Sequence, residues 1–427
     1  MMQGFVKITS LKKLVLAATI MLAAVFAAQA ATYTVNQLGD AGDGFCDATC
    51  TLRDAVTNTN NSGANDVIDF AVTGIITLGG TQLQIANNGS LTINGPGADQ
   101  LSISGNMQSR VFSINSGAIV TINGIKVTGG NGVGNNSSGN GGGIFSSGGT
   151  TITINNSTIS SNTAVRGGGM SGNGSWSIFN STISGNRATS GNGGGSDSSG
   201  QINVTDSTFS DNTASLSGGG IYNISTLTLT NSTVSGNSAG FRGGGIRNQS
   251  PLTMINSTIS NNTGGDGGGI YNDGNSVKSS NTIIAGNFSS NGPDYSGQAT
   301  SLGYNLVGNT SGNTGFNDPT DLLNQNPLLG PLQDNGGPTF THALLPGSPA
   351  IDAGNSTLTT DQRGFARPFD SAFYSNAANG SDIGAFEYQG STPTNKDQCK
   401  NGGWMTFDSP RTFINQGDCI QFVNTGK

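Results

Sequence analysis

A repeat of about 25 residues constrains the fold of this chain more than any other feature. The text NSTISSNTA starts at Asn156 and returns five times in altered form, at steps of 24 to 26 residues. A glycine triplet keeps the same period. The copies start at Asn156, Asn180, Asp206, Asn231, Asn256 and Asn281, and the triplets at Gly141, Gly167, Gly193, Gly218, Gly243 and Gly267. Two markers with one period indicate a repeat architecture in which neighbouring units share a core.

The text inside one unit indicates the kind of repeat. The stretch STLTLTNSTVSGN, residues 225–237, alternates apolar and polar residues, as a strand with one buried face does. Glycine and asparagine supply the corners, and no unit has a helical stretch. Strands that close every 25 residues and stack at about 4.8 Å form a parallel β-helix. We expect the right-handed form, with nine or ten coils over residues 66–310 and a length of about 45 Å.

Asparagine recurs at two fixed places in the unit. Stacked asparagine side chains can hydrogen-bond from one coil to the next. One predicted column is Asn162, Asn186, Asn212, Asn237, Asn262 and Asn287, and a second is Asn156, Asn180, Asn231, Asn256 and Asn281. The predicted fold is therefore all-β, with polar ladders beside an apolar core.

The charge of the chain bears on its partners, and its cysteines bear on disulfides and metal binding. Charged residues make up 10 % of the chain and the net charge is −7, so nucleic acid is not an expected partner. The four cysteines lie near the two ends, as Cys46, Cys50, Cys399 and Cys419. An even count in an exported chain indicates disulfides. Three pairings exist, of which the two local ones are simplest; zinc is the less favoured alternative.

The first 65 residues are predicted to contain a targeting segment and a cap. Residues 1–30 have a basic start, an apolar run and the end Ala28-Gln29-Ala30, which indicates a cleaved signal peptide and leaves no transmembrane span. In residues 31–65, the stretch CTLRDAVTNTN predicts an amphipathic helix with Thr51 and Asp54 as a capping box. The preceding acids Asp40, Asp43 and Asp47 are candidate Ca²⁺ ligands. We favour a solvated loop without a metal or other cofactor.

The end of the chain loses the repeat. Residues 311–390 are rich in proline, which predicts a folded, loop-rich C-terminal cap. Residues 391–427 read as a linker and a small module that holds Cys399, Cys419 and several aromatic residues.

Several segments resemble known families. CTLRDAV resembles the Cys-Ser-Leu-Arg-Glu-Ala motif of exported bacterial β-helix proteins, with Thr51 and Asp54 in place of serine and glutamate. The Gly-Gly-Gly-Ile and Ile-Ser-Gly-Asn texts are similar to repeats of polymorphic outer-membrane proteins. GPLQDNGGPTFTHALLPGSPAIDAG, with the later DQRGFARP and DIGAFE, resembles the choice-of-anchor Q domain. The tail resembles a Cys-Lys-Asn-Gly-Gly-Trp module. These resemblances imply an exported bacterial protein, extracellular or at the cell surface, with outer-membrane association as one option.

Acidic residues on the coils give little support for catalysis. The coils between Gly141 and Asn291 contain no glutamate. Their acids are Asp197, Asp206, Asp211, Asp266 and Asp273, and no two share a column in adjacent coils. Arg242 and Asp266 are predicted to form a surface ion pair, in a column that also holds Arg166. A Ser348–His342–Asp352 triad lacks the local pattern of a nucleophile.

We therefore expect a non-catalytic, secreted or cell-surface β-helix protein with an adhesin-like or structural role, and no catalytic residues. A carbohydrate-active β-helix, either a polysaccharide lyase or a glycoside hydrolase, is the first alternative. A glycan-binding module without turnover is the second. The expected partners are host or environmental glycans, or surface proteins.

Overall fold

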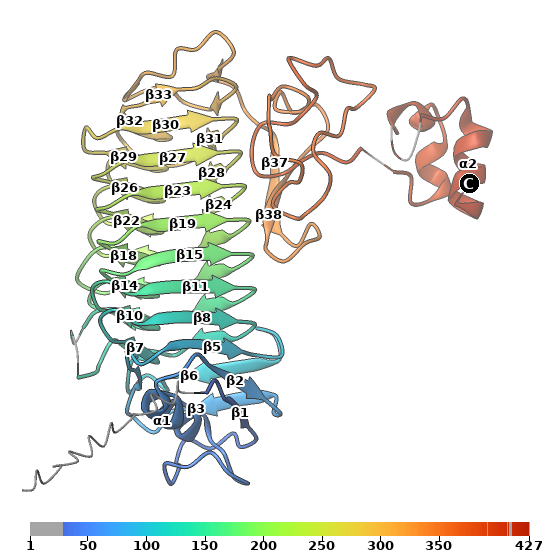
Figure 1. The fold of residues 1–427 in the computed structure, drawn as a ribbon. Coiled ribbons are helices and arrows are strands. Elements are labelled where there is room, and N and C mark those ends of the chain that lie inside the picture. Colours follow the sequence, from blue (N-terminus) through green and yellow to red (C-terminus); the bar gives the residue numbers. More distant parts are fainter. Residues whose placement is uncertain are drawn as a thin grey trace, which may run out of the picture.

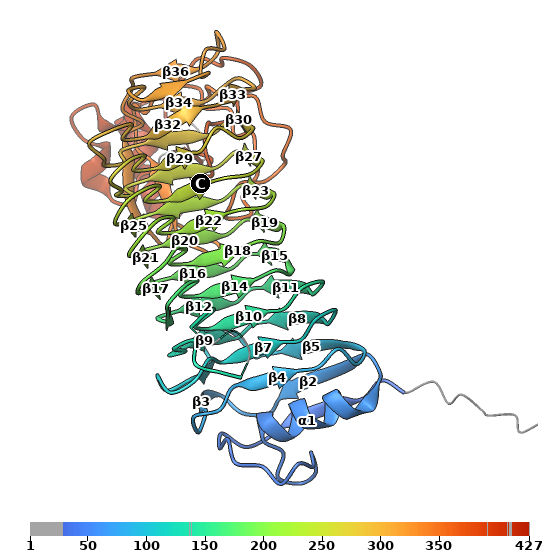
Figure 2. The same ribbon diagram turned by 90° about the vertical axis from the view of Figure 1, so that its left-hand side faces the viewer.

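The chain folds into a parallel β-helix, as predicted, with about ten coils (Figures 1 and 2). The computed structural model describes residues 29–135, 137, 139–390, 392–407, 409 and 412–426. The predicted signal peptide lies outside the described residues except for its last two positions. Within the described part, no helix is long and apolar enough to span a membrane.

Each regular coil contributes one strand to each of four parallel sheets, here named A to D. Along the chain the strands follow in the order A, B, D and C. Sheet A consists of β1 (Thr32–Val35), β2 (Asp66–Phe70), β5 (Ser90–Asn94), β8 (Ile119–Asn123), β11 (Thr151–Asn155), β15 (Ser175–Phe179), β19 (Ile202–Thr205), β23 (Leu227–Thr230), β27 (Leu252–Ile255), β30 (Val277–Ser280) and β33 (Thr300–Ser301). Sheet B consists of β3 (Gly74–Thr77), β6 (Leu101–Ser104), β9 (Lys126–Thr128), β12 (Thr158–Ser160), β16 (Thr182–Ser184), β20 (Thr208–Ser210), β24 (Thr233–Ser235), β28 (Thr258–Ser260), β31 (Ile283–Ala285), β34 (Leu306–Val307) and β36 (Leu322–Leu323).

The other two sheets complete the coil. Sheet C consists of β4 (Leu83–Ile85), β7 (Phe112–Ile114), β10 (Ile144–Ser146), β14 (Met170–Gly172), β18 (Ser196–Ser198), β22 (Ile221–Asn223), β26 (Ile246–Asn248), β29 (Ile270–Asn272), β32 (Tyr295–Gln298) and β35 (Asn313–Thr314). Sheet D is short and consists of β13 (Thr163–Ala164), β17 (Arg187–Ala188), β21 (Thr213–Ala214) and β25 (Ser238–Ala239). The solenoid thus extends beyond the predicted range of 66–310 at both ends.

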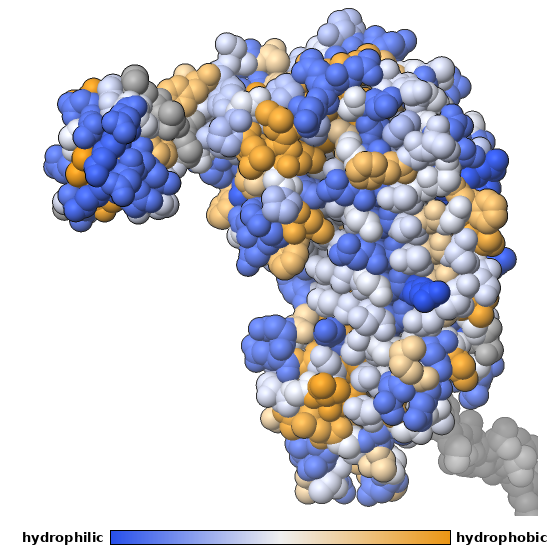
Figure 3. Space-filling model, turned by 180° about the vertical axis from the view of Figure 1, so that it is seen from behind, coloured by the Kyte–Doolittle hydropathy of each residue, from blue (hydrophilic) through white to orange (hydrophobic). Residues whose placement is uncertain are grey.

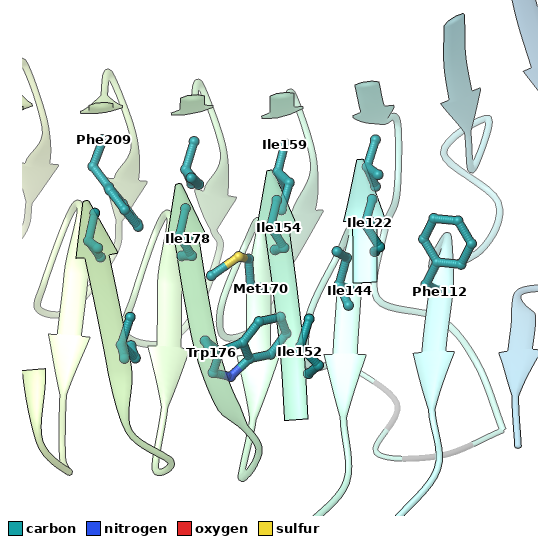
Figure 4. Close-up of a cluster of buried hydrophobic side chains, with 14 of the residues drawn as sticks. Phe112, Ile122, Ile144, Ile152, Ile154, Ile159, Met170, Trp176, Ile178 and Phe209 are labelled. Carbon is teal, nitrogen blue, oxygen red and sulfur yellow. The ribbon is translucent and has the colours of Figure 1, made fainter. Parts of the chain in front are cut away.

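The apolar positions of the repeat stack inside the solenoid. Ile221 pairs with Ile246 in sheet C, and Val234 pairs with Ile259 in sheet B, each one 25-residue step apart. Because register is conserved from coil to coil, like side chains meet like side chains along the axis. Figure 4 shows such rows, in which Ile122, Ile154 and Ile178 lie in successive coils of sheet A.

One asparagine column forms a continuous buried ladder. It runs through Asn162, Asn186, Asn212, Asn237, Asn262 and Asn287. Each Nδ2 donates to the Oδ1 of the next asparagine at 2.8 to 3.0 Å, and each side chain is at most 5 % exposed. The last member, Asn287, donates to the Asp294 carboxylate at 2.9 Å. The ladder therefore satisfies amide groups that would be costly to bury unpaired.

The second asparagine column has a different role. Its members adopt a left-handed backbone, with φ of 45° to 47°, at the corner between sheets A and B. Asparagine tolerates this conformation better than most residues do. Their amides do not form a ladder. Three of them instead bind residues of the C-terminal segment: Asn231 donates to Thr360, Asn256 to Ser356 and Asn281 to Asn355.

The two ends of the solenoid are closed differently. At the first coil, helix α1 (Leu52–Ser62) has the predicted capping box between Thr51 and Asp54. It buries Leu52, Ala55 and Val56 against the core. At the other end the chain after β34 covers the last coil, and Phe316 packs edge-on against Tyr295 with ring centroids 5.4 Å apart.

The proline-rich segment is loop-rich, as predicted, but it covers a side of the solenoid instead of its end (Figure 1). Residues 327–390 include the hairpin of β37 (Leu329–Gln333) and β38 (Thr341–Leu344). They lie against the outer face of sheet B, where Thr233 donates to Gln362 and Thr208 donates to the carbonyl of Phe340. In the rear view of Figure 3, apolar patches gather near this segment.

The tail forms a small module of its own. It contains the 3₁₀ helices η1 (Lys396–Cys399) and η2 (Gly403–Thr406) and helix α2 (Gln416–Thr425). The disulfide between Cys399 and Cys419 lies beside Phe407 and Phe413 in its core. The other disulfide joins Cys46 and Cys50 before α1. Both pairings are the local ones.

Replacing Asn237 with leucine tests the ladder. The substitution removes Oδ1, the acceptor for both the backbone N–H and the side-chain amide of Asn212. We expect the free energy of unfolding to fall by roughly 2–4 kcal/mol, measured by urea denaturation. Asn203→Leu, on the outer side of sheet A, is the matched control and should change it little. Equal effects of the two substitutions would contradict a stabilising ladder.

Candidate functional site

The outer face of sheet C and the turns that flank its strands gather most of the charge on the regular coils. The middle residue of each strand in this sheet points away from the core, as in β22, where Ile221 and Asn223 are buried and Tyr222 is half-buried. Register places these residues in one row: Phe145, Ser171, Asp197, Tyr222, Arg247, Tyr271 and Ser296. Aromatic and charged side chains therefore follow one another along the axis.

A second row runs beside the first, formed by the residue before each glycine triplet. It contains Arg166, Asn192, Ser217, Arg242 and Asp266, joined by backbone hydrogen bonds between coils. The glycines let the rows approach. A Cβ on Gly218, whose φ is +65°, would lie 2.8 Å from the Cα of Tyr222, and one on Gly243 would lie 2.6 Å from the nitrogen of Arg247. Only glycine fits this turn.

The second row, the residues of the first row from Asp197 to Tyr271 and the neighbouring Asp273 form one surface, here called the arginine–tyrosine strip. The strip consists of Arg166, Asn192, Asp197, Ser217, Tyr222, Arg242, Arg247, Asp266, Tyr271 and Asp273. It carries three arginines and three aspartates, so its own charge is close to neutral.

Arg247 is held firmly within the strip. Its Nε and Nη2 donate to the Asp273 carboxylate at 3.1 and 3.0 Å, and Nη1 donates to Ser217 at 3.3 Å. Its guanidinium lies over the ring of Tyr222 at 5.4 Å from the centroid. These contacts fix the orientation of Arg247, as a preorganised binding surface requires.

Arg242 is held more loosely. Its guanidinium stacks on Tyr271 at 4.6 Å from the ring centroid. The predicted ion pair with Asp266 is present, with Nε 3.7 Å from Oδ2, and Asp273 lies 3.9 Å from Nη1. Both distances are longer than a hydrogen bond. The stacked ring therefore orients Arg242 while leaving its N–H groups accessible.

A cavity of about 610 Å³ opens along the strip. Its walls include Arg242, Arg247 and Asp266, together with Phe241, whose side chain is 62 % exposed. The lining is Asn192, Leu216, Ser217, Gly240, Phe241, Arg242, Arg247, Gly265 and Asp266. Leu216 and Phe241 are the apolar side chains of this lining, and the charged and polar side chains converge beside them, a combination that ligand sites use.

Asp197 is an unusual member of the strip. It is only 8 % exposed, and burial raises its pKa to about 6, although Arg166 acts in the opposite direction. None of the described residues donates a hydrogen bond to its carboxylate. A buried acid without such support reduces stability, and shifted pKa values of this kind concentrate at functional sites.

The other acids of the coils lie elsewhere. Asp206 occupies a corner between sheets A and B, where burial raises its pKa to about 6 beside Asp361 and Arg367 of the C-terminal segment. Asp211 has a left-handed backbone on another corner. Neither joins the strip, so the five coil acids are not brought together.

The other residues considered in the sequence also stay apart. Asp40 pairs with Arg53 at 2.9 Å, while the carboxylates of Asp43 and Asp47 accept from neighbouring backbone amides. In the described part of the chain, no group of three potential metal ligands occurs. His342 contacts Ser235 of β24 at 2.8 Å, whereas Ser348 donates to the carbonyl of Pro327, so no triad forms.

A buried charge cluster lies inside the C-terminal segment. Arg367 and Glu387 form an ion pair at 2.8 Å with both side chains fully buried, and Arg363 pairs with Asp361 at 2.6 Å. Burial and the neighbouring Glu387 raise the pKa of Asp382. Because its groups are enclosed and mutually bonded, this cluster holds the loops of the segment together.

No protein-family model matches the chain, and no curated protein matches it. Among solved structures, the chain is similar to the crystal structure of pectate lyase Pel9A, with a TM-score of 0.47 and 13 % identity over 84 % of this chain and 96 % of that chain. The resemblances to the CSLREA-type motif, the outer-membrane repeats and the choice-of-anchor domain therefore stay predictions.

Asp197→Asn tests the electrostatic cost of the buried acid. Because the folded-state pKa is raised, ionisation penalises the folded state. The penalty is absent below the ordinary pKa near 3.8 and complete above about 6. We expect the variant to be more stable than the native chain by on the order of 2 kcal/mol at pH 7 and equally stable at pH 3. Melting curves across this range measure the difference; a gain that does not vary with pH would contradict it.

Proposed function

We propose that this chain is an exported bacterial β-helix protein that acts by binding and not by turnover, with an adhesin-like role. It is secreted or held at the cell surface, and the arginine–tyrosine strip is its contact with a glycan ligand. The two disulfides fit an oxidising location, and they accompany the predicted signal peptide. The solenoid provides a long, rigid support for the strip.

The alternation of Tyr222, Arg247 and Tyr271 beside the cavity is the observation that carries this proposal. Tyrosine offers an apolar ring for the hydrophobic face of a sugar and a hydroxyl for its edge. Guanidinium and carboxylate groups offer planar sets of donors and acceptors for sugar hydroxyls. Ser217 of the Tyr222 coil and Asn192 of the preceding coil also line the cavity, so polar groups extend along the axis.

The acids of the strip favour binding over turnover. Asp273 is engaged by Arg247, and Asp266 lies beside Arg242. General acid–base catalysis on a glycosidic bond uses two carboxylates that flank the bond. Asp266 lines the cavity beside Arg242, whereas Asp273 is bound by Arg247, so each of these carboxylates has an arginine as its neighbour.

Asp197 favours a second candidate, a carbohydrate-active enzyme. A carboxylate whose pKa is near 6 can accept and return a proton at neutral pH. The positive charge of Arg166 acts on it and lowers its pKa. An enzyme of this kind would bind the same class of ligand at the strip as the binding protein proposed above. It would differ in that it cleaves the ligand and releases products.

A glycan array tests the binding proposal. We expect the native chain to bind a subset of glycans and Tyr271→Ala to lower their affinity by roughly tenfold, because it removes the platform under Arg242. Phe179→Ala, an exposed aromatic residue on sheet A, is the matched control and should bind normally. Absence of binding to every glycan would contradict the proposal and leave structural roles.

The same preparation separates binding from turnover. Incubation with pectin, alginate and glycosaminoglycans should yield no new reducing ends or unsaturated products. Turnover that is lost in Asp197→Asn would establish the enzyme instead.

A further inference from the structure

We infer that the arginine–tyrosine strip binds an anionic polysaccharide, one that carries carboxylate or sulfate groups and lies along the solenoid axis, with Arg242 and Arg166 as its anion contacts. This inference rests on the proposed function and narrows the ligand from glycans in general to acidic chains.

The distribution of arginine supports this ligand class. The chain as a whole is acidic, with a net charge of −7. Between Gly141 and Asn291 it has four arginines, and three of them, Arg166, Arg242 and Arg247, belong to the strip. The fourth, Arg187, is exposed on sheet D. Guanidinium groups bind carboxylates and sulfate-like oxyanions through paired hydrogen bonds.

Two of the strip arginines have N–H groups that are available to a ligand. No acceptor among the described residues lies within hydrogen-bond distance of the Arg242 guanidinium, whose side chain is 44 % exposed. Arg166 is exposed and forms no ion pair within the described part of the chain. Arg247, in contrast, is matched by Asp273. Arg242 and Arg166 can therefore bind an incoming anion without first breaking a strong protein contact.

The spacing of these arginines fits a chain and not a single ion. Arg166 and Arg242 lie three coils apart in the same row, which corresponds to roughly 14 Å at the spacing of stacked strands. Between them lie the small, largely buried side chains of Asn192 and Ser217, which line the cavity together with Arg242. An extended acidic polysaccharide can contact both arginines at once, which raises its affinity over that of a monosaccharide.

The near-neutral charge of the strip separates this ligand from nucleic acid. A nucleic acid carries one charge per nucleotide and is bound through extended basic surfaces. The strip contains as many aspartates as arginines, and the whole chain is acidic. Separated arginines with an aromatic platform match the lower charge density of a polysaccharide.

Retention of the full chain on immobilised polysaccharides tests the inference. The supports are alginate for carboxylate, heparin for sulfate, neutral dextran, and single-stranded DNA. We expect retention on alginate, heparin or both, release by added salt, and weak retention on dextran and DNA. Arg242→Gln should weaken affinity for the acidic support roughly tenfold, and Arg166→Gln should weaken it further. Arg187→Gln is the matched control and should change nothing.

Distinct outcomes contradict distinct claims. Three results would contradict an anionic polysaccharide ligand: equal retention on dextran and the acidic supports, stronger retention on DNA, or equal effects of Arg242→Gln and Arg187→Gln. The first of these results would still be consistent with glycan binding. Absence of retention on all polysaccharides, together with an empty glycan array, would overturn the proposed function itself. Melting curves confirm that each variant is folded before it is compared.

Discussion

Hydrogen bonds between identical side chains in successive coils are the interaction on which this structure depends. A chain with so few large apolar residues has a narrow core, and its corners must bury polar groups close to that core. The Asn162–Asn287 ladder solves this problem, since each amide both donates to one neighbour and accepts from another. Such pairing holds only if register is conserved over many coils, and this explains why the sequence repeats so closely.

The positions at which the coils depart from the repeat give this chain its distinctive surface. Glycine triplets recur because each coil needs the same tight turn, but the residues beside them are free to vary. In the middle coils these variable positions hold two arginines and two tyrosines. Arg242 stacks on Tyr271 and Arg247 lies over Tyr222, each pair across neighbouring coils. A regular scaffold thereby presents an irregular set of side chains with fixed spacing, and the spacing itself is set by strand stacking.

The sequence predicted what its periodicity encodes. The β-helix, the buried asparagine ladder, the capping box at Thr51 and the contact of Arg242 with Asp266 all follow from residues one period apart or within one turn. Residues one period apart in the sequence stack directly on one another, so contacts along the solenoid axis could be predicted by counting residues.

Contacts between columns or between segments could not be predicted in this way. The strip was missed because Tyr222 and Ser217 belong to different columns, which approach only through the φ of Gly218. The side-on position of the C-terminal segment was missed because that segment has no repeat. The corner asparagines were assigned to a ladder because spacing does not distinguish an inward side chain from one that faces another segment. Asn231 binds Thr360, 129 residues away, and no local pattern signals that contact.

Hydrogen–deuterium exchange of the full chain, with and without an acidic polysaccharide, tests the central claim that the departures from the repeat carry the function. We expect the polysaccharide to slow exchange in residues 164–173, 215–224, 240–249 and 264–273, and to leave residues 327–390 unchanged. Slowed exchange centred on the C-terminal segment, or spread evenly over all coils, would contradict it.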